Sequence, residues 1–153
     1  MHKHLRVLWF VLVVFVQTAS FATGKRWLAS GGFGLTFDPS RVLLSPQMEY
    51  PYQPNIWIGP LVQLAPGAVS TLFSVSANAR VVLGDHPSVK PTFEAGVGIA
   101  SIGSSLGAAI NMGMGFDFRL ERNIELGTMI RLNLVPSVAT FFSWPLIIGR
   151  FLL

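Results

Sequence analysis

The amino-acid sequence predicts an all-β fold, an eight-stranded antiparallel up-and-down transmembrane β-barrel preceded by a helical signal peptide. From Ser105 to Leu134, large apolar side chains alternate with small or polar ones. This period of two residues is typical of a strand with two unlike faces. The chain is 51% hydrophobic and only 12% charged, about half the charge of an ordinary soluble domain. Turn signals recur between the apolar segments. We expect a signal peptide at 1–22 and a barrel domain at 23–153.

The first segment has the order of features found in exported proteins. Lys3 and Arg6 make a basic start, Val7 to Val16 is almost wholly apolar, and Ser20 and Ala22 are small residues at the positions that a signal peptidase recognises. These features predict cleavage after Ala22. The alternative is an uncleaved anchor helix, which the apolar run disfavours because a membrane span needs about 20 residues.

Five candidate strands follow, each with large apolar residues on one face and small or polar residues on the other. In the first, Phe33 and Leu35 oppose Gly32 and Gly34. Proline, glycine and aspartate clusters such as Asp38-Pro39-Ser40 mark the turns between them. The predicted ranges are Trp27–Phe37, Val42–Tyr50, Asn55–Ala65, Thr71–Leu83 and Val89–Ser101.

The alternating segment itself predicts a hairpin that turns at Glu121-Arg122-Asn123. Leu, Ile, Met and Phe fill one face, whereas glycine shares the other face with charged residues. A soluble core is not built this way, so we expect glycine and charge inside a narrow barrel and the apolar face in lipid. A last strand, about Phe141–Leu153, has two candidate lipid faces, one with Phe142, Trp144, Leu146 and Ile148 and the other with Ile147, Phe151 and Leu153.

Strand length and number agree with a membrane crossing. Strands of about nine to thirteen residues span a hydrocarbon layer of about 30 Å when tilted, and an even number of strands brings both termini to one side. A closed sheet also has no edge whose backbone groups would be left unsatisfied in lipid.

Three segments carry a family resemblance: Pro91–Ala100, Asn111–Arg119 and Asn123–Leu126. They resemble the C-terminal half of small bacterial outer-membrane β-barrel proteins. The resemblance implies a porin-like protein of the cell envelope in the bacterial outer membrane, with membrane lipids around it and the outer-membrane assembly machinery as a partner during biogenesis. Two features depart from the family: the chain ends Gly149-Arg150-Phe151-Leu152-Leu153 without the usual terminal aromatic residue, and every connection is short.

Six charged residues fall on the predicted inner face. An arginine on the lipid face would cost about 2 to 4 kcal/mol near the midplane, which forces such residues inward. Because eight strands enclose little more than their own side chains, we expect a structural ion-pair network that fills a polar lumen. The alternative is a narrow polar conduit or a small-ligand pocket. The six residues are Arg80, Glu94, Asp117, Arg119, Glu125 and Arg131.

The sequence does not predict an enzyme, a cofactor or a metal site. Gly103-Ser104-Ser105-Leu106-Gly107 matches a nucleophile elbow, but no histidine follows it. Gly96-Val97-Gly98 is a lone glycine pair, His86 is a lone histidine in a turn, and there is no cysteine. Nine basic and seven acidic residues follow the predicted cleavage site, an excess too small to suggest nucleic acid as a partner.

Five aromatic residues lie near predicted strand ends or on the outer half. They fit the interfacial girdles of membrane barrels, and a plain packing role is the alternative for each. They are Trp27, Tyr50, Tyr52, Trp57 and Trp144.

Three other classes of protein stay open at this stage, together with the oligomeric state. A helical inner-membrane protein would use Val7–Phe21, Ala95–Phe116 and Leu132–Gly149 as spans. A soluble lipocalin-like barrel would need apolar residues on the same face as Glu94 and Arg131. A lipid-modifying barrel enzyme would need an outward serine-histidine pair, which the sequence lacks. The leading hypothesis is an outer-membrane barrel with a structural or narrow-passage role.

Overall fold

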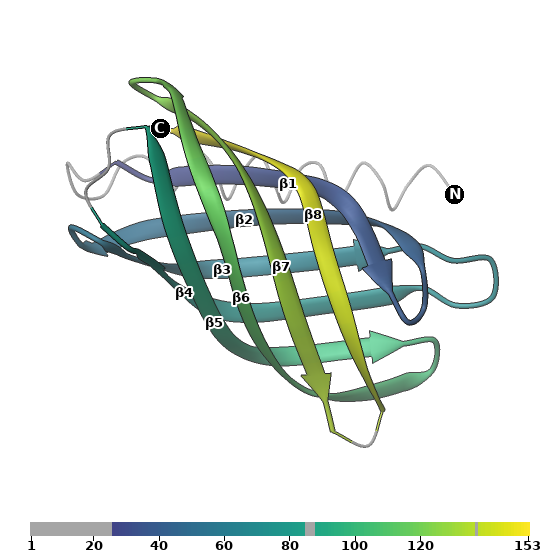
Figure 1. Cartoon of the computed structure of the whole chain (residues 1–153). Coiled ribbons are helices and arrows are strands. Elements are labelled where there is room, and N and C mark those ends of the chain that lie inside the picture. The colour runs from purple at the N-terminus through teal and green to yellow at the C-terminus, as the bar shows by residue number, and fades with distance from the viewer. Residues whose placement is uncertain (1–25, 85–87, 137) are drawn as a thin grey trace.

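The computed structural model describes residues 26–84, 88–136 and 138–153, and their regular structure consists of eight β-strands (Figure 1). The predicted eight-stranded barrel is confirmed, whereas the predicted signal peptide lies outside the described residues. The strands are β1 (Leu28–Phe37), β2 (Arg41–Gln53), β3 (Ile56–Ala65), β4 (Leu72–Val82), β5 (Val89–Ile102), β6 (Ser105–Glu121), β7 (Ile124–Val135) and β8 (Ala139–Leu152).

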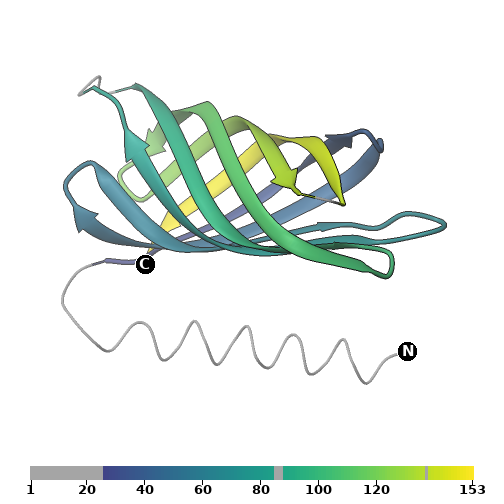
Figure 2. The same ribbon diagram turned by 90° about the horizontal axis from the view of Figure 1, so that it is seen from below.

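The sheet closes on itself in sequence order. Each strand pairs antiparallel with the next, and β8 returns to pair with β1, where Ser30 lies opposite Arg150. The strands tilt strongly around the barrel, as the two views in Figures 1 and 2 show. Closure gives every strand two partners, which satisfies backbone groups that lipid could not satisfy.

The two ends of the barrel are defined here by the strand ends that lie there. The termini-side mouth holds Trp27 and Leu153, whose backbones are hydrogen bonded at 2.8 Å, together with the end of β2, β4, β6 and β8 and the start of β1, β3, β5 and β7. The far mouth holds the opposite ends of the same strands. At the far mouth, β5 and β6 turn at Gly103, whose φ of 63° favours glycine.

Within the described ranges, the structure contains no helix that is both long enough and apolar enough to span a membrane. Ala95–Phe116 and Leu132–Gly149, the spans of the helical alternative, each form a strand, a turn and a second strand. That alternative is therefore wrong for these two segments, and its third span lies outside the described residues.

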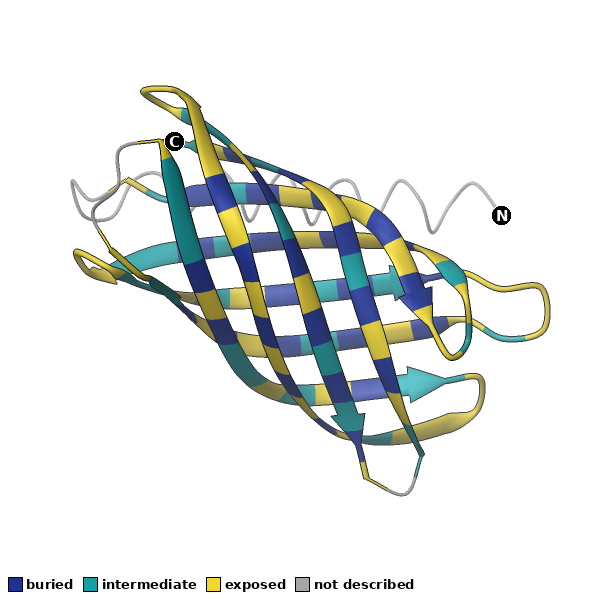
Figure 3. Cartoon of the chain, in the orientation of Figure 1, coloured by how far each residue is buried: buried dark blue, intermediate teal, exposed yellow. Residues whose placement is uncertain are grey.

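Exposure alternates along every strand, as the banding in Figure 3 shows. In β6 the side chains of Met114 and Phe116 are exposed, whereas Asn111 and Asp117 are buried. The polar face therefore points into the barrel and the apolar face points out. A lipocalin-like barrel would have the opposite arrangement, so the structure does not favour that alternative.

A bulge in β8 explains why the last strand has two candidate lipid faces. Phe33 of β1 pairs with Ile147 and Gly34 pairs with Pro145, so Leu146 is an extra residue. Phe142, Trp144 and Leu146 point outward before the bulge, and Ile147 and Phe151 point outward after it. Both predicted faces are partly right, and Ile148 is the member that turns inward.

The bulge disturbs the backbone ladder between β7 and β8, and side chains on the outer surface replace part of it. The Thr128 hydroxyl donates to the Pro145 carbonyl at 3.3 Å, and the Trp144 indole N–H donates to the same hydroxyl at 3.1 Å. Such local partners are required wherever a sheet is irregular at membrane depth.

Inward glycines lie opposite the large polar side chains that fill the barrel. Gly113 pairs with Arg131 and Gly127 pairs with Asp117. A Cβ added at Gly113 would lie 2.8 Å from Arg131 Cγ, and one added at Gly127 would lie 2.3 Å from Asp117 Oδ1. The glycines therefore provide the space that the charged side chains occupy.

We expect Gly115→Ala to lower the free energy of unfolding by about 1 to 3 kcal/mol, because an added Cβ would lie 2.1 Å from the Thr128 carbonyl oxygen. Gly31→Ala is the matched control, since nothing lies within 4 Å of its added Cβ, and its effect should stay within about 0.5 kcal/mol. Urea unfolding of the barrel in lipid vesicles measures both. Equal effects of the two variants would contradict the close packing at Gly115.

Candidate functional site

The lumen is the candidate site, and its chemistry changes from one mouth to the other. The end nearest the far mouth is filled by a plug of packed apolar side chains contributed by seven strands. Ile102 and Val138 are partly buried and pack against the plug. The plug comprises Leu43, Ala65, Leu72, Ala100, Ala109, Val135 and Phe141.

Amide side chains lie beneath the plug and join strands that are far apart in the sequence. Gln63 Nε2 of β3 donates to Asn133 Oδ1 of β7 at 2.8 Å, and Asn133 Nδ2 donates to Ser143 Oγ of β8 at 3.0 Å. Asn111 Nδ2 donates to Asn78 Oδ1 at 3.3 Å. The Gln63–Asn133 and Asn111–Asn78 bonds tie together strands that do not share a backbone ladder, whereas the Asn133–Ser143 bond joins the neighbouring strands β7 and β8.

The first buried ion pair joins Arg131 of β7 to Glu94 of β5. Arg131 Nε and Nη2 each donate a hydrogen bond of 3.2 Å to a different carboxylate oxygen of Glu94, so the ion pair is bidentate. Asn78 also donates to Glu94, and Arg131 Nη2 lies 3.5 Å from Gln47 Oε1. Both charged side chains are at most 1% exposed, so each depends on the other for its solvation.

The second ion cluster is centred on Arg80 of β4. Its Nε lies 2.8 and 3.1 Å from the two Glu49 oxygens, and its Nη1 lies 3.0 Å from Asp117 Oδ2. Asp117 Oδ1 lies 3.3 Å from Arg150 Nη1, so two guanidinium groups share one carboxylate. Gln47 Nε2 donates to Glu49 at 3.4 Å and thereby links this cluster to Arg131.

A third group of charges lies at the termini-side mouth and is partly open to solvent. Lys90 Nζ contacts Glu125 Oε1 at 2.5 Å, with both side chains less than one-fifth exposed. Arg119 Nε lies 3.7 Å from the same oxygen and its side chain is 48% exposed. The exposed Arg119 pair is weak by comparison with the buried pairs.

The six charged residues selected from the sequence therefore fall into two groups. Arg80, Glu94, Asp117 and Arg131 lie in the buried clusters, whereas Glu125 and Arg119 lie at the mouth. Their collective role as a structural network stays a prediction.

Sequence reasoning missed Glu49 and Arg150, which complete the buried clusters. The alternation in β2 placed Glu49 on the inner face beside Ser45 and Gln47, and this signal could have identified it. The bulge at Leu146 hid the orientation of Arg150, because it reverses the parity of β8.

Trp57 differs from the other aromatic residues of the predicted girdles. Its ring lies over the Arg80 guanidinium, with 5.7 Å between the Arg80 Cζ and the ring centroid. Trp27 and Tyr50 pair at 5.2 Å between ring centroids and line a hollow on the outer surface. The girdle interpretation therefore does not describe Trp57, which covers a buried cation at the termini-side mouth.

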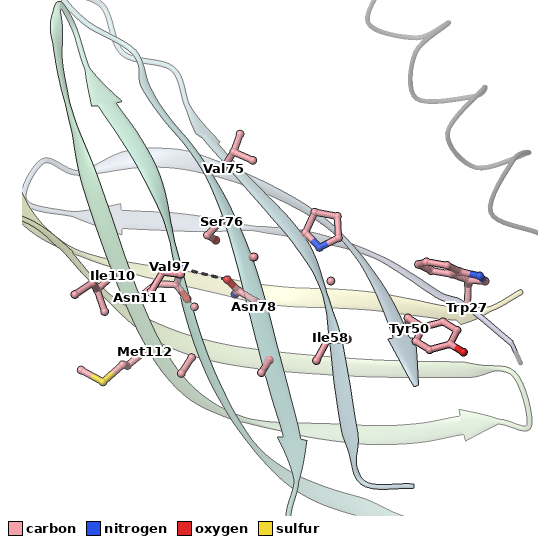
Figure 4. A pocket seen from close by; sticks show the side chains of 16 residues that line it. Trp27, Tyr50, Ile58, Val75, Ser76, Asn78, Val97, Ile110, Asn111 and Met112 are labelled. Carbon is pink, nitrogen blue, oxygen red and sulfur yellow. Dashed lines mark hydrogen bonds between the residues drawn. The ribbon is translucent and has the colours of Figure 1, made fainter. Parts of the chain in front are cut away.

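The outer surface itself has a wide, open hollow of about 1210 Å³ across β3 to β6 (Figure 4). The residues at the bottom of the hollow, Pro60, Ala77, Ala79 and Ala95, have short side chains, so the outer surface is recessed there. Val75, Val97, Ile110 and Met112 border it, and the hydrogen bond between Asn111 and Asn78 lies on the lumen side of the same strands. The exposed lining of the hollow is mostly apolar.

The described residues form neither a metal-ligand cluster nor a nucleophile elbow. No group of three or more histidine, aspartate, glutamate or cysteine side chains in these ranges is arranged to hold a metal ion. Ser105 begins β6 directly after a strand and a two-residue turn, whereas a nucleophile elbow needs a helix there.

Comparison with known proteins identifies the fold. No protein-family model and no curated protein matches the sequence. Among solved structures, the N-terminal β-barrel domain of Pseudomonas aeruginosa OprF is similar over 86% of this chain and 100% of that domain, with a TM-score of 0.67 and 15% identity.

Two further barrels show how varied proteins of this architecture are. Neisserial surface protein A aligns over 84% of this chain and 97% of its own, with a TM-score of 0.61 and 17% identity. The outer membrane enzyme PagL aligns over 81% and 98%, with a TM-score of 0.56 and 17% identity. At these identities the likeness shows a shared eight-stranded outer-membrane barrel fold.

We expect Glu94→Gln to lower the free energy of unfolding by about 3 to 5 kcal/mol, because it leaves the Arg131 charge buried without its partner. Arg119→Gln is the control and should cost less than about 1 kcal/mol, since that pair is long and exposed. Equilibrium unfolding in lipid vesicles, followed by tryptophan fluorescence, measures both. A Glu94→Gln variant as stable as the parent would contradict the importance of the pair.

Proposed function

We propose that this protein is an integral β-barrel of a bacterial outer membrane with a closed, side-chain-filled lumen, and that it serves as a structural membrane component. One observation carries the proposal: a closed sheet that holds its charged residues inside presents its large apolar residues outside. This orientation is the reverse of that in a soluble protein.

The apolar outer surface supports the membrane assignment. Soluble monomers rarely expose contiguous apolar patches beyond a few hundred Å². Here exposed large apolar side chains occur on all eight strands, including Phe33, Phe73, Met114, Ile130 and Phe142. Lipid is the solvent that suits such a surface on every side, so membrane lipids are the first partner that we propose.

The packing of the lumen supports a closed structural role over an open passage. A solute would have to cross both the apolar plug and the buried ion clusters, and Phe141, Leu43, Arg80 and Arg131 are each at most 1% exposed. Eight strands enclose just enough space for side chains to fill.

We further propose that the protein is not an enzyme. The fold permits catalysis, as PagL is described as an outer membrane enzyme. In this chain, however, the buried carboxylates of Glu49, Glu94 and Asp117 all face guanidinium groups, which suits them to ion pairing. Export by the predicted signal peptide and insertion by the outer-membrane assembly machinery belong to the same proposal.

We expect the mature protein to fractionate with the outer membrane and to migrate differently on a denaturing gel before and after boiling, because closed barrels resist detergent until heated. N-terminal sequencing of the mature protein should begin at Thr23 if cleavage follows Ala22. Recovery in the soluble fraction, or identical migration of the boiled and unboiled samples, would contradict the membrane barrel.

We expect the folded barrel to show no steady ion conductance in planar bilayers, because the plug and the ion clusters close the lumen in series. A porin of 16 strands, which encloses an aqueous channel, is the positive control. Reproducible conductance that scales with the amount of this protein would contradict the closed structural role and would support the narrow passage instead.

A further inference from the structure

The termini-side mouth contains a cavity that the structural role does not use. It has a volume of about 110 Å³, and it is lined by residues of β1, of β3 to β8 and of the connection 122–123. At about 30 Å³ for each water molecule, this volume equals roughly three to four waters, which is enough for one phosphate or carboxylate group. The cavity is therefore of a size that selects small ligands or single functional groups.

The lining of this cavity is strongly cationic. Arg80, Lys90, Arg119 and Arg122 contribute four positive charges, and Glu125 contributes one negative charge. Arg80 is already matched by Glu49 and Asp117, and Lys90 is matched by Glu125, so the excess comes from the two rim arginines. Glu121, at the end of β6, is the other described acidic residue near the rim, and it is exposed and outside the lining.

A second observation adds to the positive character behind the cavity. Arg150 is 0% exposed and shares Asp117 with Arg80, its ion-pair distance to that carboxylate being 3.3 Å. Its Nε, Nη1 and Nη2 atoms have no hydrogen-bond acceptor among the described residues. One carboxylate thus serves two guanidinium groups at the inner end of the mouth.

An apolar groove of about 390 Å³ adjoins the cationic cavity. Pro51 and Tyr52 at the end of β2 and Pro54 in the connection to β3 form one side of it. Trp57 and Leu152 line both the groove and the cavity, so the two spaces share a wall. The cavity suits an anionic group, and the Trp57 side chain beside it suits a flat or apolar group.

We propose that the termini-side mouth binds a small organic anion, with its phosphate or carboxylate group among Arg119, Arg122 and Lys90 and its apolar or ring-shaped group against Trp57. Charge-assisted hydrogen bonds from arginine suit such oxyanions, and an aromatic wall suits a ring. This site does not depend on the structural role, because it leaves the plug and the buried ion pairs unchanged.

Phenyl phosphate is a suitable probe, because it joins a ring to a phosphate. Titrated into the folded barrel in non-ionic detergent at low salt, it should change the tryptophan fluorescence saturably, and Trp57→Phe should remove most of that change. Inorganic phosphate should displace phenyl phosphate only at concentrations well above those at which phenyl phosphate binds, and phenol should not displace it at matched concentration. Equal competition by phenol would overturn the anionic half of the site.

Removal of the rim charge provides the decisive comparison. The double variant Arg119→Gln with Arg122→Gln should weaken phenyl phosphate binding at least tenfold by calorimetry, and neither residue is buried, so the barrel should still fold. Arg41→Gln removes one charge at the far mouth and should leave the affinity unchanged. Absence of saturable binding to the parent protein, or equal affinity in the double variant, would overturn the proposal.

Discussion

Closure of the sheet by the pairing of β1 with β8 is the constraint on which the rest of the structure depends. In lipid an unpaired strand edge leaves backbone groups without partners, so an open sheet of these strands would be unstable there. Closing only eight strands makes the interior narrow, and this narrowness decides which residues can point inward. It explains why Gly113 lies opposite Arg131 and why Gly127 lies opposite Asp117.

The buried charges are the consequence of filling that interior with polar side chains. The buried guanidinium groups of Arg80, Arg131 and Arg150 each have at least one carboxylate partner. Glutamine and asparagine side chains join the separate pairs into a connected set. Buried ion pairs add little net stability compared with apolar packing, but loss of one partner is costly. We therefore expect the clusters to matter more for which strands face one another across the lumen than for the net stability of the barrel.

The side chains that fill the lumen are apolar near the far mouth and charged near the termini-side mouth. The end of the lumen nearest the far mouth is filled by aliphatic side chains and Phe141. The termini-side mouth combines exposed arginines with Trp57 over a buried cation. A closed membrane scaffold and a ligand site at one mouth are compatible, because the plug and the site are at opposite ends of the barrel.

The sequence by itself determined the number of strands, their two faces and the inward position of residues such as Glu94 and Arg131, because a period of two is a local property of extended backbone. Only the tertiary structure decided which charges meet. Arg80 reaches Glu49 and Asp117 across the lumen, and strand register and closure set those distances. Local alternation could not show the inward turn of Arg150, because one extra residue at Leu146 reverses the parity of β8, and that bulge is defined only by its pairing with β1.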